Sequence, residues 1–341
     1  MDNRIEVVHT LIGHGNIKPI KVGDGLYRAY CPFCKDDIPS LFISTTLQEY
    51  HCFNCKRSGN VTNFVMEYYN TDFFGAVKIL SGKEADSEKY REDLKMYYNM
   101  NKEAAIYFND NLYKAKEGIE YWHERGISDD VIRRFGLGYI GSGGLYVHLR
   151  DKGFSPIDIL DNSLARKNNK KYHDFFYKRV MIPIISANGN IIGFGGRVLD
   201  DSKPKYLNTG QTPVFDKRMH LFGLNLAKNS HRDGLILCEG YMDVISMHQA
   251  GFDNAVASLG TALTEEQAYL ISRYTNHLYL AYDSDNAGIK ATEDAYKICR
   301  QQSIFIKCID LLDKKDPDEF IKFYGREKFA EQIKRASYFN G

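Results

Sequence analysis

The sequence has 341 residues, 43% of them apolar, which leaves room for two or three domains that each bury a core. It has no run of about 18 apolar residues and it begins with a charged segment, so we expect neither a membrane-spanning helix nor a secretory signal, and we expect a cytoplasmic protein. The net charge of +1 is unevenly spread, because residues 161–232 carry 13 Lys and Arg against 5 Asp and Glu, whereas residues 233–341 carry 12 against 17.

The N-terminal segment 1–80 contains two close cysteine pairs that are separated by 17 residues. Two C-x₂-C turns at this separation each direct two thiolates toward one point, and four thiolates complete the tetrahedral shell of a structural zinc ion. A redox-active pair is the alternative, but such a motif needs a single pair within a β-α-β unit. We therefore predict a zinc ribbon with one structural zinc ion held by Cys31, Cys34, Cys52 and Cys55.

Helical patterns follow the cysteine segment. Residues 81–101 are charged and weakly patterned, which predicts a partly helical linker. From residue 102 to about residue 126, apolar residues such as Phe108, Leu112 and Ile119 recur at helical spacing. We expect this helix to open a middle domain, residues 102–232.

The rest of the middle segment is rich in glycine and in β-prone residues. The runs VMIPIIS and IIGFGG flank Asn188-Gly189, and Asn-Gly between two apolar runs is a strong hairpin signal. The excess of 13 basic over 5 acidic residues suits contact with phosphates, although a solvated surface explains it as well. The glycines of residues 193–196 would allow a phosphate to approach the backbone, or they mark a bend or bulge.

Residues 233–341 alternate between strand-like and helix-like runs. The strand-like runs are LILC (235–238), AVAS (255–258), HLYLAY (277–282) and IFIKCI (304–309). Gly251 can end the first intervening helix, and Thr264 with Gln267 forms a capping box at the start of the second. The alternation predicts a parallel sheet covered by helices.

Acidic residues follow three of these predicted strands, namely Glu239, then Asp283 and Asp285, then Asp316 and Asp318. In an open α/β sheet such positions meet beyond the carboxyl ends of the strands, where five carboxylates require cations. Helix capping explains one such loop well and three poorly. We therefore predict a site for two or more Mg²⁺ or Mn²⁺ ions, with Asp243, one helical turn after Glu239, as a supporting or additional ligand.

These residues resemble the motifs of DnaG-type bacterial primases. Glu239-Gly-Tyr-Met-Asp243 and Asp283-x-Asp285-x-x-Gly288 resemble the TOPRIM fold, which such primases share with topoisomerases and some nucleases. The cysteine pairs followed by GNVTNFVM resemble the primase zinc ribbon. Six further segments resemble successive motifs of the primase polymerase domain: RFGLGY (134–139), KRVMIPI (178–184), IIGFGGRV (191–198), PKYLN (204–208), LFGLNLA (221–227) and VASLGTALT (256–264). The resemblance runs in unbroken order over nearly the whole chain.

The resemblance implies a multidomain α+β and α/β protein. Its parts are the zinc ribbon (1–80), the linker (81–101), a mixed α+β polymerase subdomain (102–232) and a TOPRIM α/β subdomain with a parallel sheet (233–341). It implies that Glu239 is the catalytic acid near the primer 3′-hydroxyl, with Asp283 and Asp285 as the main metal ligands and Asp316 and Asp318 as an outlying pair. The residues it implies for template or nucleotide phosphates are Arg179, Arg197, Lys205, Tyr206 and Lys217.

The activity that the resemblance implies is DNA-directed synthesis of short RNA primers during DNA replication. The template would be single-stranded DNA, and ribonucleoside triphosphates would be joined by two-metal nucleotidyl transfer. Two alternatives stay open: a zinc-finger and TOPRIM recombination mediator that binds DNA without catalysis, and a TOPRIM topoisomerase or nuclease.

The sequence departs from the family pattern in two places. Cys34 stands where many members have His, which leaves a four-cysteine zinc site. The family's helical C-terminal domain, which docks on the replicative helicase, has no counterpart here, so a helicase partner is not carried over. A compact phage or mobile-element primase, acting in the host cytoplasm, or a truncated chain would account for this.

Overall fold

A computed structural model of the chain describes residues 11, 17–34, 36–46, 48–55, 57–69, 73–80, 87–260, 262–283 and 286–338. The chain forms two compact units, Met1–Lys95 and Met96–Gly341, and each has hydrophobic core of its own. No helix within these described ranges is both long enough and apolar enough to cross a bilayer.

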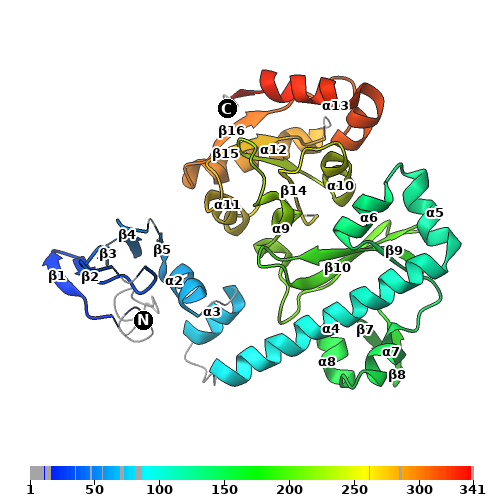
Figure 1. The fold of residues 1–341 in the computed structure, drawn as a ribbon, viewed down its shortest axis with the longest axis horizontal. Coiled ribbons are helices and arrows are strands. Elements are labelled where there is room, and N and C mark those ends of the chain that lie inside the picture. Colours follow the sequence, from blue (N-terminus) through cyan, green and yellow to red (C-terminus); the bar gives the residue numbers. More distant parts are fainter. Residues whose placement is uncertain are drawn as a thin grey trace. The chain divides into compact units, whose positions relative to one another are not determined.

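The first unit is an antiparallel sheet with helices after its last strand (Figure 1). The strand order follows the chain: β1 (Ile20–Gly23), β2 (Leu26–Ala29), β3 (Leu41–Ser44), β4 (Glu49–Cys52) and β5 (Ser58–Asn60), before α2 (Val61–Tyr68) and α3 (Phe73–Leu80). Asn60 and Asn63 cap α2 reciprocally, since each side chain accepts the other's backbone N–H. Tyr50 and Phe64 are fully buried and pack edge to face under this sheet.

A long helix, α4 (Ser87–Lys114), leads into the second unit and is followed by α5 (Lys116–Glu124). The helical pattern expected over 102–126 is confirmed, but as two helices, because Ala115 has extended backbone angles and separates α4 from α5. The expected linker is helical from Ser87 onward. Leu94, Tyr97 and Met100 explain this, because they are buried and continue the apolar stripe of Phe108 and Leu112 upstream at helical spacing.

The second unit contains a four-stranded sheet in the order β11-β10-β9-β6. Its strands are β6 (Gly138–Ile140), β9 (Arg179–Ile185), β10 (Ile191–Val198) and β11 (Tyr206–Asn208); around it lie α6 (Asp129–Phe135), α7 (Leu145–Asp151), α8 (Pro156–Asp161) and a small hairpin of β7 (Ala165–Asn168) and β8 (Lys171–Asp174). The hairpin predicted at Asn188-Gly189 is confirmed, since β9 pairs with β10 in antiparallel register. Gly189 has a φ of 88°, a conformation that favours glycine.

A six-stranded sheet, in the order β12-β14-β13-β15-β16-β17, forms the rest of the second unit (Figure 1). The elements are η1 (Lys217–Met219), β12 (Leu221–Phe222), α9 (Leu224–Ala227), β13 (Leu235–Cys238), α10 (Tyr241–Gln249), β14 (Ala255–Ser258), α11 (Glu265–Ser272), β15 (His277–Leu280), α12 (Asn286–Gln301), β16 (Phe305–Cys308), α13 (Pro317–Arg335) and β17 (Ser337–Tyr338). β14, β13, β15 and β16 are parallel, so the predicted parallel sheet is confirmed. β12 pairs with β14, so this sheet begins before residue 233.

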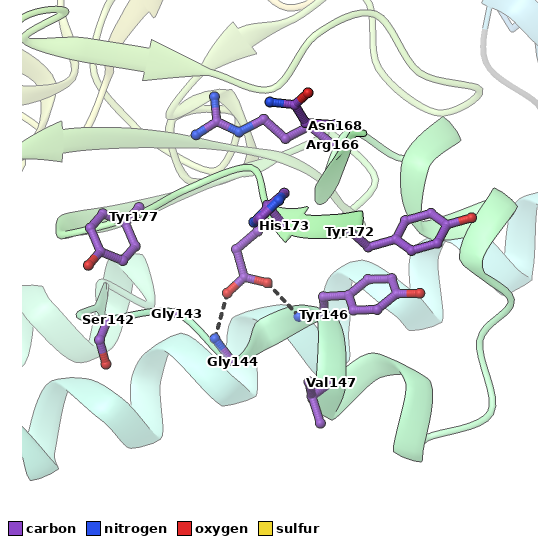
Figure 2. A pocket seen from close by; sticks show the side chains of 11 residues that line it. Ser142, Gly143, Gly144, Tyr146, Val147, Arg166, Asn168, Tyr172, His173 and Tyr177 are labelled. Atoms are coloured by element: carbon purple, nitrogen blue, oxygen red, sulfur yellow. Dashed lines mark hydrogen bonds between the residues drawn. The ribbon is translucent and has the colours of Figure 1, made fainter. Parts of the chain in front are cut away.

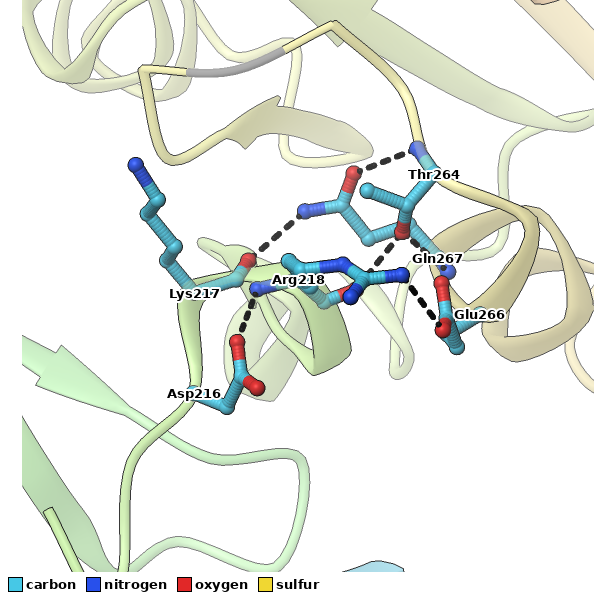
Figure 3. Close-up of polar contacts among 6 residues, drawn as sticks. All are labelled: Asp216, Lys217, Arg218, Thr264, Glu266 and Gln267. Carbon is cyan, nitrogen blue, oxygen red and sulfur yellow. Dashed lines mark hydrogen bonds and ion pairs between the residues drawn. The ribbon is translucent and has the colours of Figure 1, made fainter. Parts of the chain in front are cut away.

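The start of α11 fixes the loop that carries η1 (Figure 3). The predicted capping box is confirmed, since Thr264 and Gln267 exchange side-chain to backbone hydrogen bonds. The fully buried Gln267 amide also donates to the carbonyls of Lys217 and His220, at 3.0 and 2.9 Å. Arg218 forms an ion pair with Glu266. These contacts hold Lys217 at the start of α11.

Candidate active site

The four cysteines of the first unit meet at one point. Their Sγ atoms all lie within 4.8 Å of one another, and the pairs Cys31–Cys55 and Cys34–Cys52 are each 3.8 Å apart. A tetrahedron with Zn–S bonds of about 2.3 Å has sulfur–sulfur edges of about 3.8 Å. These two sulfur pairs match that edge, and the thiol cluster fits a structural zinc ion.

Backbone and side-chain groups orient this thiol cluster. Cys31 and Cys34 lie on the turn after β2, whereas Cys52 ends β4 and Cys55 lies on the turn that follows. The carboxylate of Asp36 accepts the Cys31 N–H at 2.9 Å, and the Cys55 N–H donates to the Cys52 sulfur at 3.4 Å. Such supporting hydrogen bonds fix ligand geometry around a metal.

In the second unit, the carboxyl ends of β13 and β15 open onto a cavity of about 460 Å³. One wall is acidic and carries Glu239, Asp243, Asp283, Asp316, Asp318 and Glu319. The basic residues that line the cavity are Arg125, Arg197, Lys205 and Lys315. We call this space the catalytic cavity.

Two of the predicted metal ligands, Glu239 and Asp283, touch each other on the acidic wall. The main-chain N–H of Asp283 donates to Glu239 Oε1 at 3.1 Å. Gly288 is part of the same arrangement, because a Cβ at that position would lie 1.9 Å from the Asp283 carbonyl oxygen. The glycine of the D-x-D-x-x-G motif thus lets the Asp283 backbone lie directly against the first turn of α12. Asp285 lies outside the described residues.

The Asp-Pro-Asp segment holds its carboxylates in two different ways. Asp316 caps α13, with Oδ1 accepting the Glu319 N–H at 2.8 Å. Asp318 accepts a hydrogen bond from the Ser246 hydroxyl on one oxygen and from Lys322 Nζ on the other, the latter at 2.8 Å. Asp318 is therefore already well solvated by protein groups, and Asp316 has the less occupied carboxylate of the two.

Asp243 shows how much negative charge the acidic wall carries. Its side chain is buried and accepts the Gly240 N–H at 3.1 Å. Burial, and after it the negative charges of Asp316, Asp283 and Asp318, raise the pKa of Asp243 to about 8. Within the described residues, no three of these carboxylates approach as closely as the four thiols do. The wall nevertheless fits divalent cations, because its charge is under-compensated by the protein.

We expect Asp243→Asn to stabilise the second unit when no Mg²⁺ or Mn²⁺ is present. A carboxyl whose folded pKa exceeds its unfolded value near 3.8 favours folding below that value and loses this contribution as the pH rises toward 8. The asparagine oxygen can keep the bond to Gly240. The melting temperature at pH 8 should rise by roughly 5 °C, and the gain should vanish near pH 4.

Asp253 gives the matched control for this stability measurement. Partial burial acts to raise the pKa of Asp253, but the hydrogen bond from the Ser230 hydroxyl and the charge of Arg232 lower it below its ordinary value. Asp253→Asn should therefore lower the melting temperature at pH 8. If Asp243→Asn stabilised the protein equally at pH 4 and pH 8, the gain would not come from removing the charge of Asp243, and this prediction would be wrong.

The basic wall is built around Arg197, which is almost fully buried. Its guanidinium lies between two rings, 5.5 Å from the centroid of Tyr121 and 5.4 Å from that of Tyr206. Burial raises the pKa of Tyr206 to about 12, so its hydroxyl stays protonated. Tyr241 donates to Asn208 at 3.0 Å beside them. The arrangement presents a fixed cation and hydroxyl groups opposite the carboxylates.

Arg179 and Lys217 do not belong to the described lining of the catalytic cavity. Arg179 is buried, and it donates to the carbonyls of Gly196 and Pro204, at 3.1 and 2.9 Å. Burial lowers the pKa of Arg179. Its position therefore ties β9 to β10 and the segment before β11, and gives no support to a phosphate contact. Lys217 lies on η1, beside α11 (Figure 3).

The glycines of β10 have a packing role that replaces the expected approach of a phosphate. A Cβ on Gly195 would lie 2.8 Å from the Tyr241 ring, and one on Gly196 would lie 2.9 Å from Phe176. Both residues are buried in the middle of the sheet. Glycine is required here because large side chains cover the strand.

Arg125 and Lys315 line the catalytic cavity although the sequence did not single them out. Arg125 follows α5 and lies over the Tyr121 ring, 6.0 Å from its centroid. Lys315 precedes the Asp-Pro-Asp segment and forms an ion pair with Asp283. Neither residue belongs to a periodic pattern in the sequence. The one sequence signal for Lys315 is its position directly before the Asp-Pro-Asp motif.

Three protein families match consecutive parts of the chain. The CHC2 zinc finger matches residues 1–95, the N-terminal domain of the DNA primase catalytic core matches 107–228, and a Toprim-like family matches 236–321. The order agrees with that expected from the sequence.

Similar proteins agree with these family matches. A DNA primase of Clostridium acetobutylicum is 43% identical over 322 residues, which cover 91% of this chain and 54% of the relative. A DNA primase of Aquifex aeolicus is 37% identical over 340 residues, covering 96% and 67%. The chain thus spans about half to two thirds of the length of these curated relatives.

Solved structures are similar as well. The zinc-binding and RNA polymerase domains of the Aquifex aeolicus primase superpose with a TM-score of 0.69 at 35% identity, covering 98% of this chain and 84% of that one. A DnaG primase catalytic domain bound to single-stranded DNA gives a TM-score of 0.67 at 32% identity, covering 73% and 81%. The predicted multidomain fold is confirmed.

Proposed function

Since the chain belongs to the DnaG-type family of bacterial DNA primases, we propose that it synthesises short RNA primers on single-stranded DNA. The observation that carries the proposal is the catalytic cavity, whose lining combines an acidic wall at the strand ends with the buried Arg197 and the exposed Lys205. An enzyme that joins nucleotides needs acidic residues to bind a divalent cation and basic residues to bind the triphosphate, and it needs them in the same cavity.

We assign the acidic wall to metal binding and the basic wall to phosphates. Glu239 and Asp283 adjoin each other and, with Asp285, would hold Mg²⁺ or Mn²⁺, while Asp316 supports them from the start of α13. When bound, such ions lower the pKa of a primer 3′-hydroxyl and offset charge on the leaving pyrophosphate. Arg125, Arg197 and Lys205 orient the triphosphate, and little protein acid–base chemistry is needed.

A second hollow of the second unit supports a template path. It has a volume of about 510 Å³, and Tyr146 and Tyr172 stack beside it with centroids 4.9 Å apart (Figure 2). The hairpin of β7 and β8 carries the exposed cations Arg166, Lys167, Lys170 and Lys171. Aromatic faces with surrounding cations suit unpaired bases and their phosphates.

We expect Tyr172→Ala to weaken the binding of single-stranded DNA about fivefold or more, because it removes half of the stacked pair. Fluorescence anisotropy with a labelled oligonucleotide measures this. Tyr274→Ala removes an exposed ring outside the hollow and should leave the affinity unchanged. Equal affinities for Tyr172→Ala and the unaltered protein would remove the hairpin from the template path.

The zinc ribbon offers a surface for the choice of initiation site. Phe53 is exposed and packs edge to face on Phe42 and His51, and Arg28 lies 5.3 Å from the Phe42 centroid. An exposed aromatic and basic face on a rigid sheet suits contact with unpaired bases. We propose that the first unit reads the template.

Primer synthesis on circular single-stranded DNA tests the function. The zinc-loaded protein is incubated with Mg²⁺ and labelled ribonucleotides, and short labelled RNA is the expected product. No RNA from any of several templates would refute primase activity. DNA binding without synthesis would favour the recombination mediator, and strand cleavage or relaxation would favour the nuclease or topoisomerase; the primase-core match at 107–228 speaks against all three.

A further inference from the structure

Lys315 occupies a position in the catalytic cavity that none of the expected roles assigns. Its Nζ atom lies 3.6 Å from Asp283 Oδ2, which is an ion pair but is longer than a normal hydrogen bond. The Lys315 side chain is 61% exposed, whereas that of Asp283 is 18% exposed. The pair is therefore held by charge alone, and its lysine can move into solvent at little cost.

The backbone at this position is fixed while the side chain is not. The Lys315 N–H donates to Glu319 Oε2 at 3.3 Å, and the adjacent Asp316 caps α13. A lysine stem that starts from a fixed point on the cavity wall can reach Asp283 in one rotamer and the cavity interior in another. Lys322 differs, since it is held on Asp318 at 2.8 Å.

We propose that Lys315 is an exchangeable counterion of the acidic wall. It neutralises Asp283 while no divalent cation is bound, it yields Asp283 when the cation arrives, and its released ammonium then contacts the triphosphate of the incoming nucleotide. The inference rests on the proposed function for its nucleotide step. Its metal step rests only on the pairing of Lys315 with a carboxylate of a wall that is short of positive charge.

The proposal makes the two binding steps respond to one substitution in opposite directions. Lys315→Met keeps the stem and removes the charge. Without the competing ammonium, Mn²⁺ should bind about two- to fivefold more tightly, the range for a partly exposed ion pair. ATP at saturating Mn²⁺ should bind about two- to fivefold more weakly, because a phosphate contact is lost. A general disturbance of the wall would weaken both.

Calorimetric titration of the zinc-loaded protein tests both steps, first with Mn²⁺ alone and then with ATP. Lys314→Met is the matched control, because the neighbouring Lys314 pairs with Asp313 and lies over the Phe323 ring outside the lining of the cavity; both affinities should stay unchanged. Unaltered or weaker Mn²⁺ binding by Lys315→Met overturns the proposal, and so does unaltered or tighter ATP binding. If the unaltered protein binds no ATP, the proposed function fails, and the Mn²⁺ titration still decides the metal step.

Discussion

Glu239→Gln should abolish primer synthesis, with a loss of about a thousandfold or more, and leave the fold intact. The side chain lies at the end of β13, directly on the loop that carries Asp283. Gln has the same shape, and its Oε1 can still accept the Asp283 N–H. What is lost is the negative charge that a divalent cation needs at the reacting centre, where charge stabilisation supplies most of the rate.

Three measurements separate this effect from damage to the fold. The variant should keep the melting temperature of the metal-free protein within a few degrees, bind Mn²⁺ more weakly and yield no labelled RNA. Glu265→Gln removes an exposed carboxylate at the start of α11, outside the lining of the catalytic cavity, and should retain full synthesis. Primer yields from Glu239→Gln within tenfold of the unaltered protein would show that another residue carries the reaction.

The features that the sequence predicted well depend on local spacing. Two C-x₂-C turns restrict four thiols to one volume whatever the rest of the chain does, and the sulfurs meet within 4.8 Å. The acidic loops follow from the rule that parallel strands share their carboxyl ends, and Glu239 and Asp283 adjoin as that rule requires. The thiol cluster and the acidic wall both follow from short segments whose positions are set by the strands next to them.

The features that the sequence missed depend on tertiary packing. Arg125 reaches the cavity only because α5 packs beside the four-stranded sheet, and no motif marks it. Arg179 lies in a family motif and carries a positive charge. Its strand is nevertheless buried on both faces, and its guanidinium donates hydrogen bonds to backbone carbonyls. The break between α4 and α5 falls at Ala115, where no Gly or Pro marks the end of a helix in the sequence.

Cys52→Ser should release the zinc ion and unfold the sheet of the first unit while the second unit stays folded. Cys52 is fully buried at the end of β4, pairs across the strand with Leu41, and contributes to the core of the first unit. A small sheet whose core includes the metal ligands depends on the metal for its folding free energy. Serine is a poor zinc ligand, and its buried hydroxyl would cost stability without the metal.

Metal analysis and hydrogen exchange measure the two parts of this prediction. Zinc content should fall from one ion per chain to near zero, and the amides of β3 and β4 should exchange within seconds while those of β9 and β10 stay protected. Cys299→Ala alters a buried cysteine outside the thiol cluster and should keep its zinc. A full zinc content in Cys52→Ser would mean that three thiols suffice. If synthesis on long templates then falls while binding to the second unit's hollow persists, the zinc unit acts at initiation and not at template capture.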